Sequence, residues 1–587
     1  MTLTPKERKT LRHSASEAAG RPAPSDLTRR GFLKGGIAAG VVSGGGLGAF
    51  YFGYETSLAN PLRVMVVGTG DEGNVLIGAI NPDYIDVKAI ADIRPYSIHR
   101  AFHGDHYSEA ALKARPGLMA KYGWKSEDEA RKHVKVYEGG VEAPGEKAGY
   151  YERLMASAKQ DGIEAVIIAL PLHDHAPAAI AAMQAGLHVL TEKLMGQTVA
   201  RCKDMARVAE QTRRHLATGH QRHYNILYAD AVDTIRRGIL GDLHYIRAQW
   251  HRSNMPGRDS WQQPLPKEVK PSDAQAEALL KKLKSWQGQL KKARGREIDV
   301  WRKRVAQVEA QLADKLIKDT ADDYGYQAKQ YKNAAGEVIY DRPAGEELIR
   351  WRLWDRTGGG LMAELGSHQL DAASIFISAV HGGKKQHPLN VAAISNRPVF
   401  EQDRDVDDHV CCIFEFPAPG YDPKDPQAAR KKIGVQYASI NGNGFGGYGE
   451  IVFGTKGTLI LEREQEAKLY RGPSASKVTA GKGAGGATMD TTDTAPAQAA
   501  EARGSVAVSR GYTEELEHWA WCIRRNPNVA DPEIRPKCHP EVAMADAVIA
   551  LTTNIAAREG RRIDFQDEWF DPKSDETPDG AKPTVPA

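Results

Sequence analysis

The sequence predicts an α/β protein in which a doubly wound parallel sheet is followed by an α+β domain with a mostly antiparallel open sheet. Short apolar runs such as 63–67 and 165–170 alternate with helical segments of about 10 to 15 residues, a pattern typical of parallel strands joined by helices. From residue 223 onward, strand-like runs such as 243–250, 433–441 and 449–461 indicate antiparallel strands. A chain of 587 residues also exceeds the size of one domain.

Residues 1–59 resemble a twin-arginine signal peptide. The pair Arg29-Arg30 follows a polar, basic stretch and precedes a weakly apolar run at 35–52 that is rich in glycine. Such a run suits this export route better than a membrane span. Small residues just before Asn60 offer a cleavage site, and an uncleaved membrane anchor is the alternative. We therefore expect a periplasmic or otherwise exported protein that the twin-arginine translocon carries as a partner.

Composition excludes some classes of partner. The net charge of +4 is spread over 79 basic and 75 acidic residues, so the chain has no strong field that would attract nucleic acid. Five cysteines are few and odd in number for an exported protein, which argues against a disulfide framework. Cys411 and Cys412 are adjacent in a strand-like run and should point to opposite faces. We expect no metal site, because no recognisable ligand spacing occurs.

A glycine-rich turn follows the first apolar run. Gly68 permits the sharp turn, Gly70 lets the backbone approach a pyrophosphate, and Gly73 lets the next helix pack closely on the strand. The phosphates would then lie at a helix N-terminus, where free N–H groups favour anions. These features predict a dinucleotide-binding Rossmann domain over residues 61–222. The contacts expected from the turn are those of Gly68, Gly70, Asp71, Glu72 and Gly73.

The cofactor preference follows from Asp92, which stands 22 residues beyond Gly70 at the end of the second apolar run. A carboxylate at this position can accept hydrogen bonds from both ribose hydroxyls of the adenosine, whereas a 2′-phosphate would meet a like charge. The sequence thus favours NAD over NADP. Arg94 lies close enough to leave NADP open as the alternative.

Two further motifs carry a resemblance to a known family. Thr191-Glu192-Lys193 ends the fifth strand, and residues 358–371 read G-G-G-L-M-A-E-L-G-S-H-Q-L-D. They resemble the E-K-P tripeptide and the G-G-G-x-x-x-D-x-G-x-H-x-x-D signature of the Gfo/Idh/MocA family of sugar and cyclitol oxidoreductases. The resemblance covers about residues 61–255 and 350–565. Leu194 replaces the family's proline, and Glu364 replaces its aspartate.

The chemistry of these residues agrees with the resemblance. Oxidising a secondary alcohol needs a base near the hydroxyl oxygen, and His368, with an unperturbed pKa of about 6.5, is the natural candidate. Lys193 at the end of a parallel strand would stabilise the developing alkoxide, although the two residues could exchange roles. Glu364 is expected to be the third catalytic residue. The resemblance also implies cofactor contacts from Leu170, His175, Glu192, Lys193 and Arg222, and substrate contacts from Lys193, His368, Asp371 and Tyr224.

These expectations lead to one favoured function and two alternative functions. The first is dehydrogenation of a carbohydrate or cyclitol with tightly bound NAD. The second is a glycosidase or lyase that oxidises its substrate transiently, eliminates a substituent and returns the hydride, with no net redox change. The third is a non-catalytic NAD-dependent binding protein.

The second domain is expected over residues 223–567. A helical insertion is predicted at about 264–318, and a flexible loop at about 472–504, where small and polar residues dominate. The tail 571–587 is predicted to be disordered. The open sheet offers a surface for a homo-oligomer.

Overall fold

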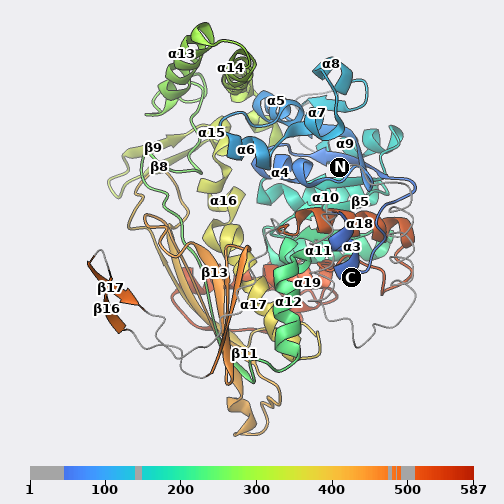
Figure 1. The fold of residues 1–587 in the computed structure, drawn as a ribbon, viewed down its shortest axis with the longest axis vertical. Coiled ribbons are helices and arrows are strands. Elements are labelled where there is room, and N and C mark those ends of the chain that lie inside the picture. Colours follow the sequence, from blue (N-terminus) through green and yellow to red (C-terminus); the bar gives the residue numbers. More distant parts are fainter. Residues whose placement is uncertain (1–44, 139–148, 473–478, 484–485, 491–508) are drawn as a thin grey trace.

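The structure, a computed structural model, describes residues 45–138, 149–472, 479–483, 486–490 and 509–587. Its first domain contains a six-stranded parallel sheet in the order β3-β2-β1-β4-β5-β6 (Figure 1). This order confirms the predicted doubly wound sheet and reverses direction between β1 and β4, which is where such sheets bind ligands. The strands are β1 Leu62–Val67, β2 Ile85–Asp92, β3 Lys135–Glu138, β4 Ala165–Ile168, β5 His188–Glu192 and β6 Leu216–Gly219.

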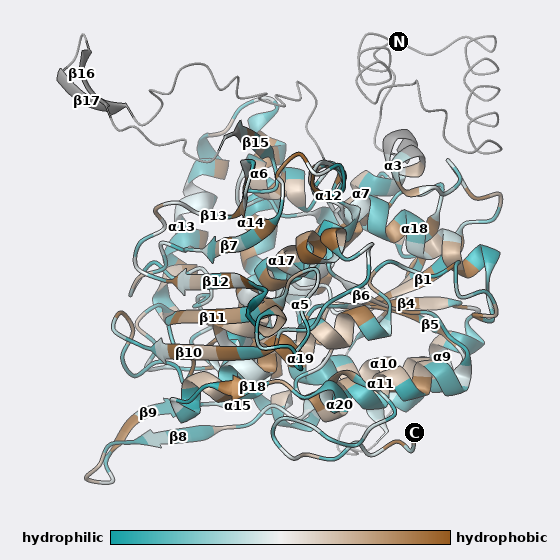
Figure 2. Cartoon of the chain, turned by 90° about the horizontal axis from the view of Figure 1, so that it is seen from below, coloured by the Kyte–Doolittle hydropathy of each residue, from teal (hydrophilic) through white to brown (hydrophobic). Residues whose placement is uncertain are grey.

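Strands β4, β5 and β6 of this sheet are buried on both faces because helices cover each side. Every residue of β4, β5 and β6 is buried, which explains why their sequences lack the alternation of a half-exposed strand. The brown, hydrophobic segments of strands and helices in Figure 2 belong to this core. The main covering helices are α4 Asp71–Ala79, α5 Pro95–His103, α9 Tyr150–Gln160, α10 His175–Gln184 and α11 Val199–Thr212.

The second domain is built on an eight-stranded sheet, in the order β15-β14-β13-β7-β12-β11-β10-β18. Only the pair of β7 and β12 is parallel among these neighbours, so the expected mostly antiparallel sheet is confirmed. The run predicted as one strand at 449–461 is a hairpin, because the chain turns between Gly454 and Gly457. The strands are β7 Leu243–Trp250, β10 Asn390–Asn396, β11 His409–Pro417, β12 Lys432–Ile440, β13 Tyr448–Gly454, β14 Gly457–Glu462, β15 Glu466–Arg471 and β18 Ile563–Asp564.

One face of this sheet carries helices and the other is open. Helices α17 (Ser367–Val380) and α19 (Pro540–Glu559) pack on the covered face, with α12 (Ile226–Arg236) against α17 (Figure 1). Buried and less buried residues alternate along β11, so Cys412 is buried and Cys411 is exposed, as predicted. All five cysteines are free thiols.

A helical hairpin interrupts the second domain and packs on the first. Helices α13 (Ala276–Lys292) and α14 (Glu297–Ala313) lie at the top of Figure 1, where α14 contacts α5 of the Rossmann domain. A two-stranded sheet of β8 (Lys329–Lys332) and β9 (Val338–Arg342) follows. Part of the predicted loop at 472–504 is likewise paired, because β16 (Thr479–Gly483) and β17 (Gly486–Asp490) form a hairpin. The rest of that loop lies outside the described residues.

The prediction of a disordered tail after residue 571 is wrong. Lys203 of α11 donates to the carbonyl oxygens of Asp571 and Ser574 at 2.9 and 2.8 Å. Asp204 accepts hydrogen bonds from the backbone N–H groups of Thr584 and Val585 at 2.7 and 2.8 Å. A polar composition suggests disorder because it buries little apolar surface. Charged side chains of α11 stabilise this tail instead, through hydrogen bonds to its backbone.

The end of the predicted signal peptide is packed against the folded domain. Helix α3 (Gly45–Phe52) contacts α18 (Tyr512–Arg525), and the Tyr54 hydroxyl donates to Glu517 Oε2 at 2.6 Å. The Phe52 ring packs edge-on against Tyr224 with centroids 5.6 Å apart. The arginine pair and most of the apolar run lie outside the described residues.

No described helix is both long enough and apolar enough to span a bilayer.

Removing residues 1–59 should lower the thermal unfolding temperature relative to removing residues 1–44. The deletion of residues 1–44 is the reference, so the difference between the two melting temperatures measures the contribution of residues 45–59. Loss of the Tyr54 hydroxyl would leave the buried Glu517 carboxylate with one partner fewer, a loss that costs about 1–3 kcal/mol. Circular dichroism melts of both deletions and of Tyr54→Phe measure this difference. Equal melting temperatures would show that residues 45–59 contribute nothing to the fold.

Candidate active site

The glycine-rich turn between β1 and α4 has the geometry that its sequence predicts. Gly68 has φ +84°, which favours glycine, and a Cβ on Gly73 would collide with the Gly68 carbonyl oxygen. A Cβ on Gly70 would instead meet nothing within 4 Å. Gly70 is the N-cap of α4, so open space lies beside a helix N-terminus. This cradle fits a pyrophosphate, which the free N–H groups would bind.

Asp92 closes this turn from the end of β2. Its Oδ2 accepts from the Thr69 N–H at 2.6 Å and from the Thr69 hydroxyl at 3.0 Å, while its Oδ1 accepts from the Arg94 N–H at 2.8 Å. Burial raises the pKa of Asp92, and the hydrogen bonds from Arg94 and Thr69 act in the opposite direction. Asp92 therefore organises the glycine turn in addition to facing the site where a ribose would bind.

A cavity of about 410 Å³ opens beside Asp92, between the Rossmann domain and the segment that follows the helical hairpin. Leu170 and Tyr150 line it from the first domain, and Tyr324 and Tyr326 line it from the second. The rings of Tyr150 and Tyr324 are 5.4 Å apart and nearly perpendicular. An aromatic wall of this kind, beside a carboxylate and a helix N-terminus, fits the adenosine half of a dinucleotide.

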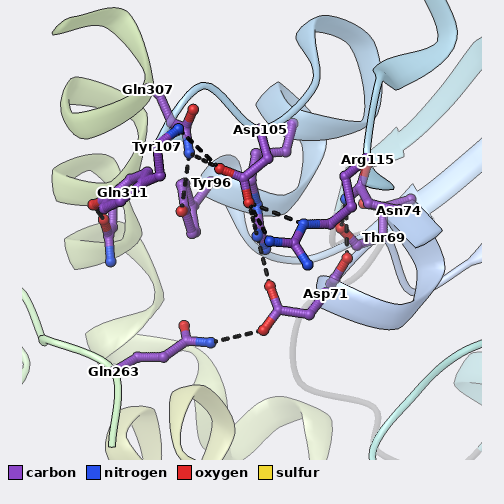
Figure 3. Close-up of polar contacts among 12 residues, drawn as sticks. Thr69, Asp71, Asn74, Tyr96, Asp105, Tyr107, Arg115, Gln263, Gln307 and Gln311 are labelled. Carbon is purple, nitrogen blue, oxygen red and sulfur yellow. Dashed lines mark hydrogen bonds and ion pairs between the residues drawn. The ribbon is translucent and has the colours of Figure 1, made fainter. Parts of the chain in front are cut away.

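Asp71 and Glu72 do not line this cavity, although both lie in the turn. Asp71 accepts from Arg100 Nη1 at 2.6 Å and from Gln263 Nε2 at 3.2 Å, and Figure 3 shows it directed toward Gln263. Burial raises the pKa of Glu72, and the cations of Lys193 and Arg352 act in the opposite direction. Neither residue lines the cavity, and their contacts with a cofactor stay a prediction.

Lys193 joins the two domains at the end of β5. Its Nζ donates to the Glu364 carbonyl oxygen at 2.6 Å and lies 3.7 Å from Glu364 Oε2. Arg352 Nε donates to Glu364 Oε1 at 2.8 Å. Burial alone would raise the pKa of Glu364, but Lys193 and Arg352 outweigh it and lower that pKa to about 2. The site therefore holds an anionic Glu364 between two cations.

His368 follows Glu364 by one helical turn and lies on α17. Its side chain is buried beside Trp250, with ring centroids 5.6 Å apart, and its Nδ1 has no hydrogen-bond partner among the described residues. Burial lowers the pKa of His368 well below 6.5, and the cations of Lys193 and Arg222 lower it further. A neutral imidazole next to an ammonium can accept a proton, so the pair has the components of acid–base chemistry.

The first domain matches a known family. Residues 62–220 match the GFO_IDH_MocA model, described as an oxidoreductase family with an NAD-binding Rossmann fold. This part of the chain is similar to a Gfo/Idh/MocA domain. The strand order and glycine turn described above are those of such a domain, and Lys193 lies within it.

Curated relatives of the chain match it in part. A "Glycosyl hydrolase family 109 protein" of Stenotrophomonas maltophilia (strain K279a) is 29% identical over 192 residues, which cover 32% of this chain and 35% of the relative. A protein of the same name from Shewanella amazonensis (strain ATCC BAA-1098 / SB2B) is 28% identical over 232 residues, 37% of this chain and 44% of the relative. The chain thus matches less than half the length of these relatives.

Solved structures that align with the chain are distant in sequence. The NAD-binding protein from Listeria innocua is 15% identical, with 86% of this chain and 97% of that chain covered and a TM-score of 0.45. The aldose-aldose oxidoreductase from Caulobacter crescentus, complexed with glycerol, is 14% identical, with 86% and 100% covered and a TM-score of 0.46.

Two residues assigned to ligand contacts from the resemblance are buried and paired with protein groups. Arg222 is fully buried, pairs with Glu450 and Glu464, and donates to the His368 carbonyl oxygen at 2.6 Å. Through the His368 carbonyl oxygen it stabilises α17. Asp371 is also fully buried, where it bonds His223 Nε2 at 2.9 Å. Sequence spacing could not show this, because burial depends on how the two domains pack.

His175 and Tyr224 are likewise held by protein groups. The His175 ring bonds the carbonyl oxygens of Leu194 and Leu170 at 2.8 and 2.9 Å, and so links the ends of β5 and β4. The peptide bond between Lys193 and Leu194 is cis, at the position where the Gfo/Idh/MocA family has proline. The Tyr224 hydroxyl bonds His518 Nδ1 at 2.9 Å on the side of α18. Both side chains are thus engaged by protein groups, and their assignment to ligand contacts stays a prediction.

A buried cluster behind His368 contains groups that can bind metals. Ligand atoms of His220, Cys538 and Asp546 lie within 4.8 Å of one another. Lys385 enters the same cluster, with its Nζ 2.5 Å from Asp546 Oδ1 and 3.6 Å from Asp371 Oδ1. The ammonium supplies the positive charge that buried carboxylates need. We therefore assign this cluster to holding α17 and α19 together.

Sequence reasoning missed residues that complete the site. Arg352 fixes the Glu364 carboxylate, and an alternation of arginine and tryptophan directly ahead of the 358–371 signature was the available signal. Trp250 packs on His368 from the end of β7. Arg252 lies over the Trp250 ring at 5.6 Å, which extends the cationic side of the site. No local signal marks Trp250 or Arg252, because only sheet pairing places them beside α17.

Turnover should stay high as the pH falls through 6.5. In a plot of kcat against pH, the decline on the acidic side should lie below pH 6.5. His368 can accept a proton only when neutral, and its lowered pKa keeps it neutral below its ordinary value of 6.5. A pH profile of kcat on an accepted substrate measures this decline. If kcat instead declines at or above pH 6.5, and this decline disappears in His368→Gln, the lowered pKa of His368 would be contradicted.

Proposed function

We propose that the protein is an exported oxidoreductase that transfers a hydride between tightly bound NAD and a secondary alcohol of a sugar, glycoside or cyclitol. The observation that carries this proposal is the contact of Lys193 with Glu364 across the two domains, beside a neutral His368. The Gly70 cradle and the cavity beside Asp92 would hold the dinucleotide, whose nicotinamide supplies the hydride acceptor. Ligand binding at the carboxyl end of a parallel sheet supports this placement.

The chain's own groups divide the remaining chemistry. His368 takes the proton from the substrate hydroxyl, so that the C–H electron pair can leave as hydride and a carbonyl remains. The Lys193 ammonium lies on the same side and stabilises the negative charge on that oxygen. Glu364 orients Lys193, and Arg352 fixes the Glu364 carboxylate.

A redox-neutral glycosidase or lyase is the second candidate, and the family 109 names of the curated relatives favour it. In that reaction, oxidation of one sugar carbon acidifies the neighbouring C–H. Loss of that proton expels the glycosidic substituent, water adds in the hydrolytic case, and the hydride returns to the carbonyl. The same acid–base groups would serve both candidates.

Incubation with a panel of glycosides and free sugars distinguishes the candidates. The protein is desalted extensively and assayed without added cofactor, because the proposal requires NAD to stay bound. Released aglycone without net NADH indicates the redox-neutral reaction, whereas an oxidised sugar with stoichiometric NADH indicates dehydrogenation. A protein that yields neither product, with or without added NAD, would contradict both candidates and leave a binding role.

Export and tight retention of NAD form one proposal. The Arg29-Arg30 motif supports export, and a twin-arginine substrate crosses the membrane folded, with its cofactor inside. We also propose that the open face of the second sheet, where Ile394 and Ile413 are exposed, forms a homo-oligomer. Cell fractionation tests the location, and light scattering of Ile413→Lys against the unaltered chain tests the interface.

A further inference from the structure

Arg94 is the chain's one cation within two residues of Asp92, and it lines the cavity beside that residue. In Rossmann domains an arginine in this region can accommodate the 2′-phosphate of NADP. Here the guanidinium has another partner, because Arg94 Nε and Nη2 both donate to Asp314 Oδ2, at 2.9 and 2.8 Å. Asp314 lies 220 residues away in sequence, directly after α14.

The pair is buried, which makes it hard to break. Side-chain exposure is 10% for Arg94 and 1% for Asp314. Asp314 Oδ1 also accepts from the Tyr96 N–H at 3.0 Å, so the carboxylate is held at both oxygens. Separating a buried pair leaves an uncompensated charge, so Arg94 stays with Asp314 rather than turning to a ligand.

The helical hairpin that carries Asp314 is fixed to the Rossmann domain at further points. Gln307 of α14 donates to Asp105 Oδ1 at 2.8 Å, and its amide oxygen accepts from the His106 N–H at 2.5 Å. Figure 3 shows Gln307 and Gln311 directed from α14 toward the Rossmann side chains, with Tyr107 reaching Gln311. Asp314 is therefore presented to Arg94 by a docked element.

We propose that Asp314, on the helical insertion, is the residue that selects NAD over NADP, by engaging the arginine that would otherwise bind a 2′-phosphate. The proposal rests on dinucleotide binding at the cradle. Asp92 repels a 2′-phosphate directly, and Asp314 removes the cation that could compensate for this repulsion. An acidic residue on an insertion in the second domain thus controls a preference usually set within the Rossmann domain.

Calorimetric titration of the full chain, first stripped of retained NAD with activated charcoal, with AMP and with adenosine 2′,5′-bisphosphate tests the proposal independently of catalysis. The unaltered chain should bind AMP more tightly than the bisphosphate. Asp314→Ala should tighten bisphosphate binding by about tenfold or more, the scale of one charge-assisted contact, with AMP affinity changed far less. Asp314→Asn keeps the side-chain shape and should show the same direction if the alanine variant unfolds.

Two further variants show whether the gain in bisphosphate affinity comes from a freed Arg94 guanidinium. Gln307→Ala loosens the same interface without freeing Arg94 and should not tighten bisphosphate binding. Adding Arg94→Ala to Asp314→Ala should abolish the gain. Failure of the unaltered chain, folded and free of NAD, to bind AMP would contradict dinucleotide binding itself. AMP binding without any gain for the bisphosphate in either Asp314 variant, or an equal gain in Gln307→Ala, would overturn the role of Asp314 alone.

Discussion

Replacing Lys193 with methionine is expected to lower turnover by about 10² or more, the usual scale for a lost acid–base or charge-stabilising group, while the fold and bound cofactor persist. Methionine keeps most of the aliphatic length but cannot donate to the Glu364 carbonyl oxygen or neutralise its carboxylate. Because the lost charge acts on the developing alkoxide, the effect should appear mainly in kcat. Steady-state kinetics on a substrate found with the glycoside panel, together with a cofactor assay, measure both.

The matched control is Lys113→Met, since Lys113 is an exposed lysine of the Rossmann domain on the short helix Glu109–Ala114. It should leave turnover unchanged. His368→Ala should reproduce the loss seen in Lys193→Met, because both residues act on the same oxygen. If both active-site variants retain full activity, the active site lies elsewhere.

Gly70→Val is expected to abolish cofactor retention without unfolding the protein. A Cβ at Gly70 would meet no protein atom within 4 Å, so the added side chain should be accommodated by the apo fold. It would instead fill the space in which the backbone must approach a pyrophosphate. Cofactor content after desalting, measured by absorbance or mass spectrometry, and a thermal melt of the same sample separate the two effects.

Gly73→Ala provides the contrast, because its Cβ would collide with the Gly68 carbonyl oxygen and force the turn apart. This variant should lose stability as well as cofactor. Normal NAD content in Gly70→Val would show that the dinucleotide does not cross the glycine turn.

The sequence predicted much of the fold and several residues of the site. The spacing of apolar residues indicated both the parallel sheet and the open antiparallel sheet. A strand buried on both faces is apolar throughout, whereas a strand buried on one face alternates apolar and polar residues. Sequence reasoning failed for the tail after residue 571, whose polar composition gives no sign of the lysine, arginine and aspartate of α11 that bind it. It also failed for the strand at 449–461, where a hairpin turn lies inside one apolar run.

Some residues of the site could likewise be predicted from the sequence, and others could not. Gly68, Gly70 and Asp92 could be predicted because a turn beside a helix N-terminus demands particular residues at short, fixed spacings. By themselves, the motifs around Lys193 and His368 located these two residues without showing what surrounds them. Spacing placed Arg222 and Asp371 among the ligand contacts but could not show that both are buried and paired with protein groups, because spacing records neither burial nor pairing.

By itself, the sequence determined the glycine turn, the carboxylate after the second strand, and the lysine and histidine motifs, because these depend on residues that are neighbours in the chain. Only the tertiary structure decided which charges meet: Lys193 with Glu364, and Arg94 with Asp314. The partners in these pairs are 171 and 220 residues apart. Electrostatic pairing depends on distance and burial in space, which arise only after the two domains and the helical insertion have packed together.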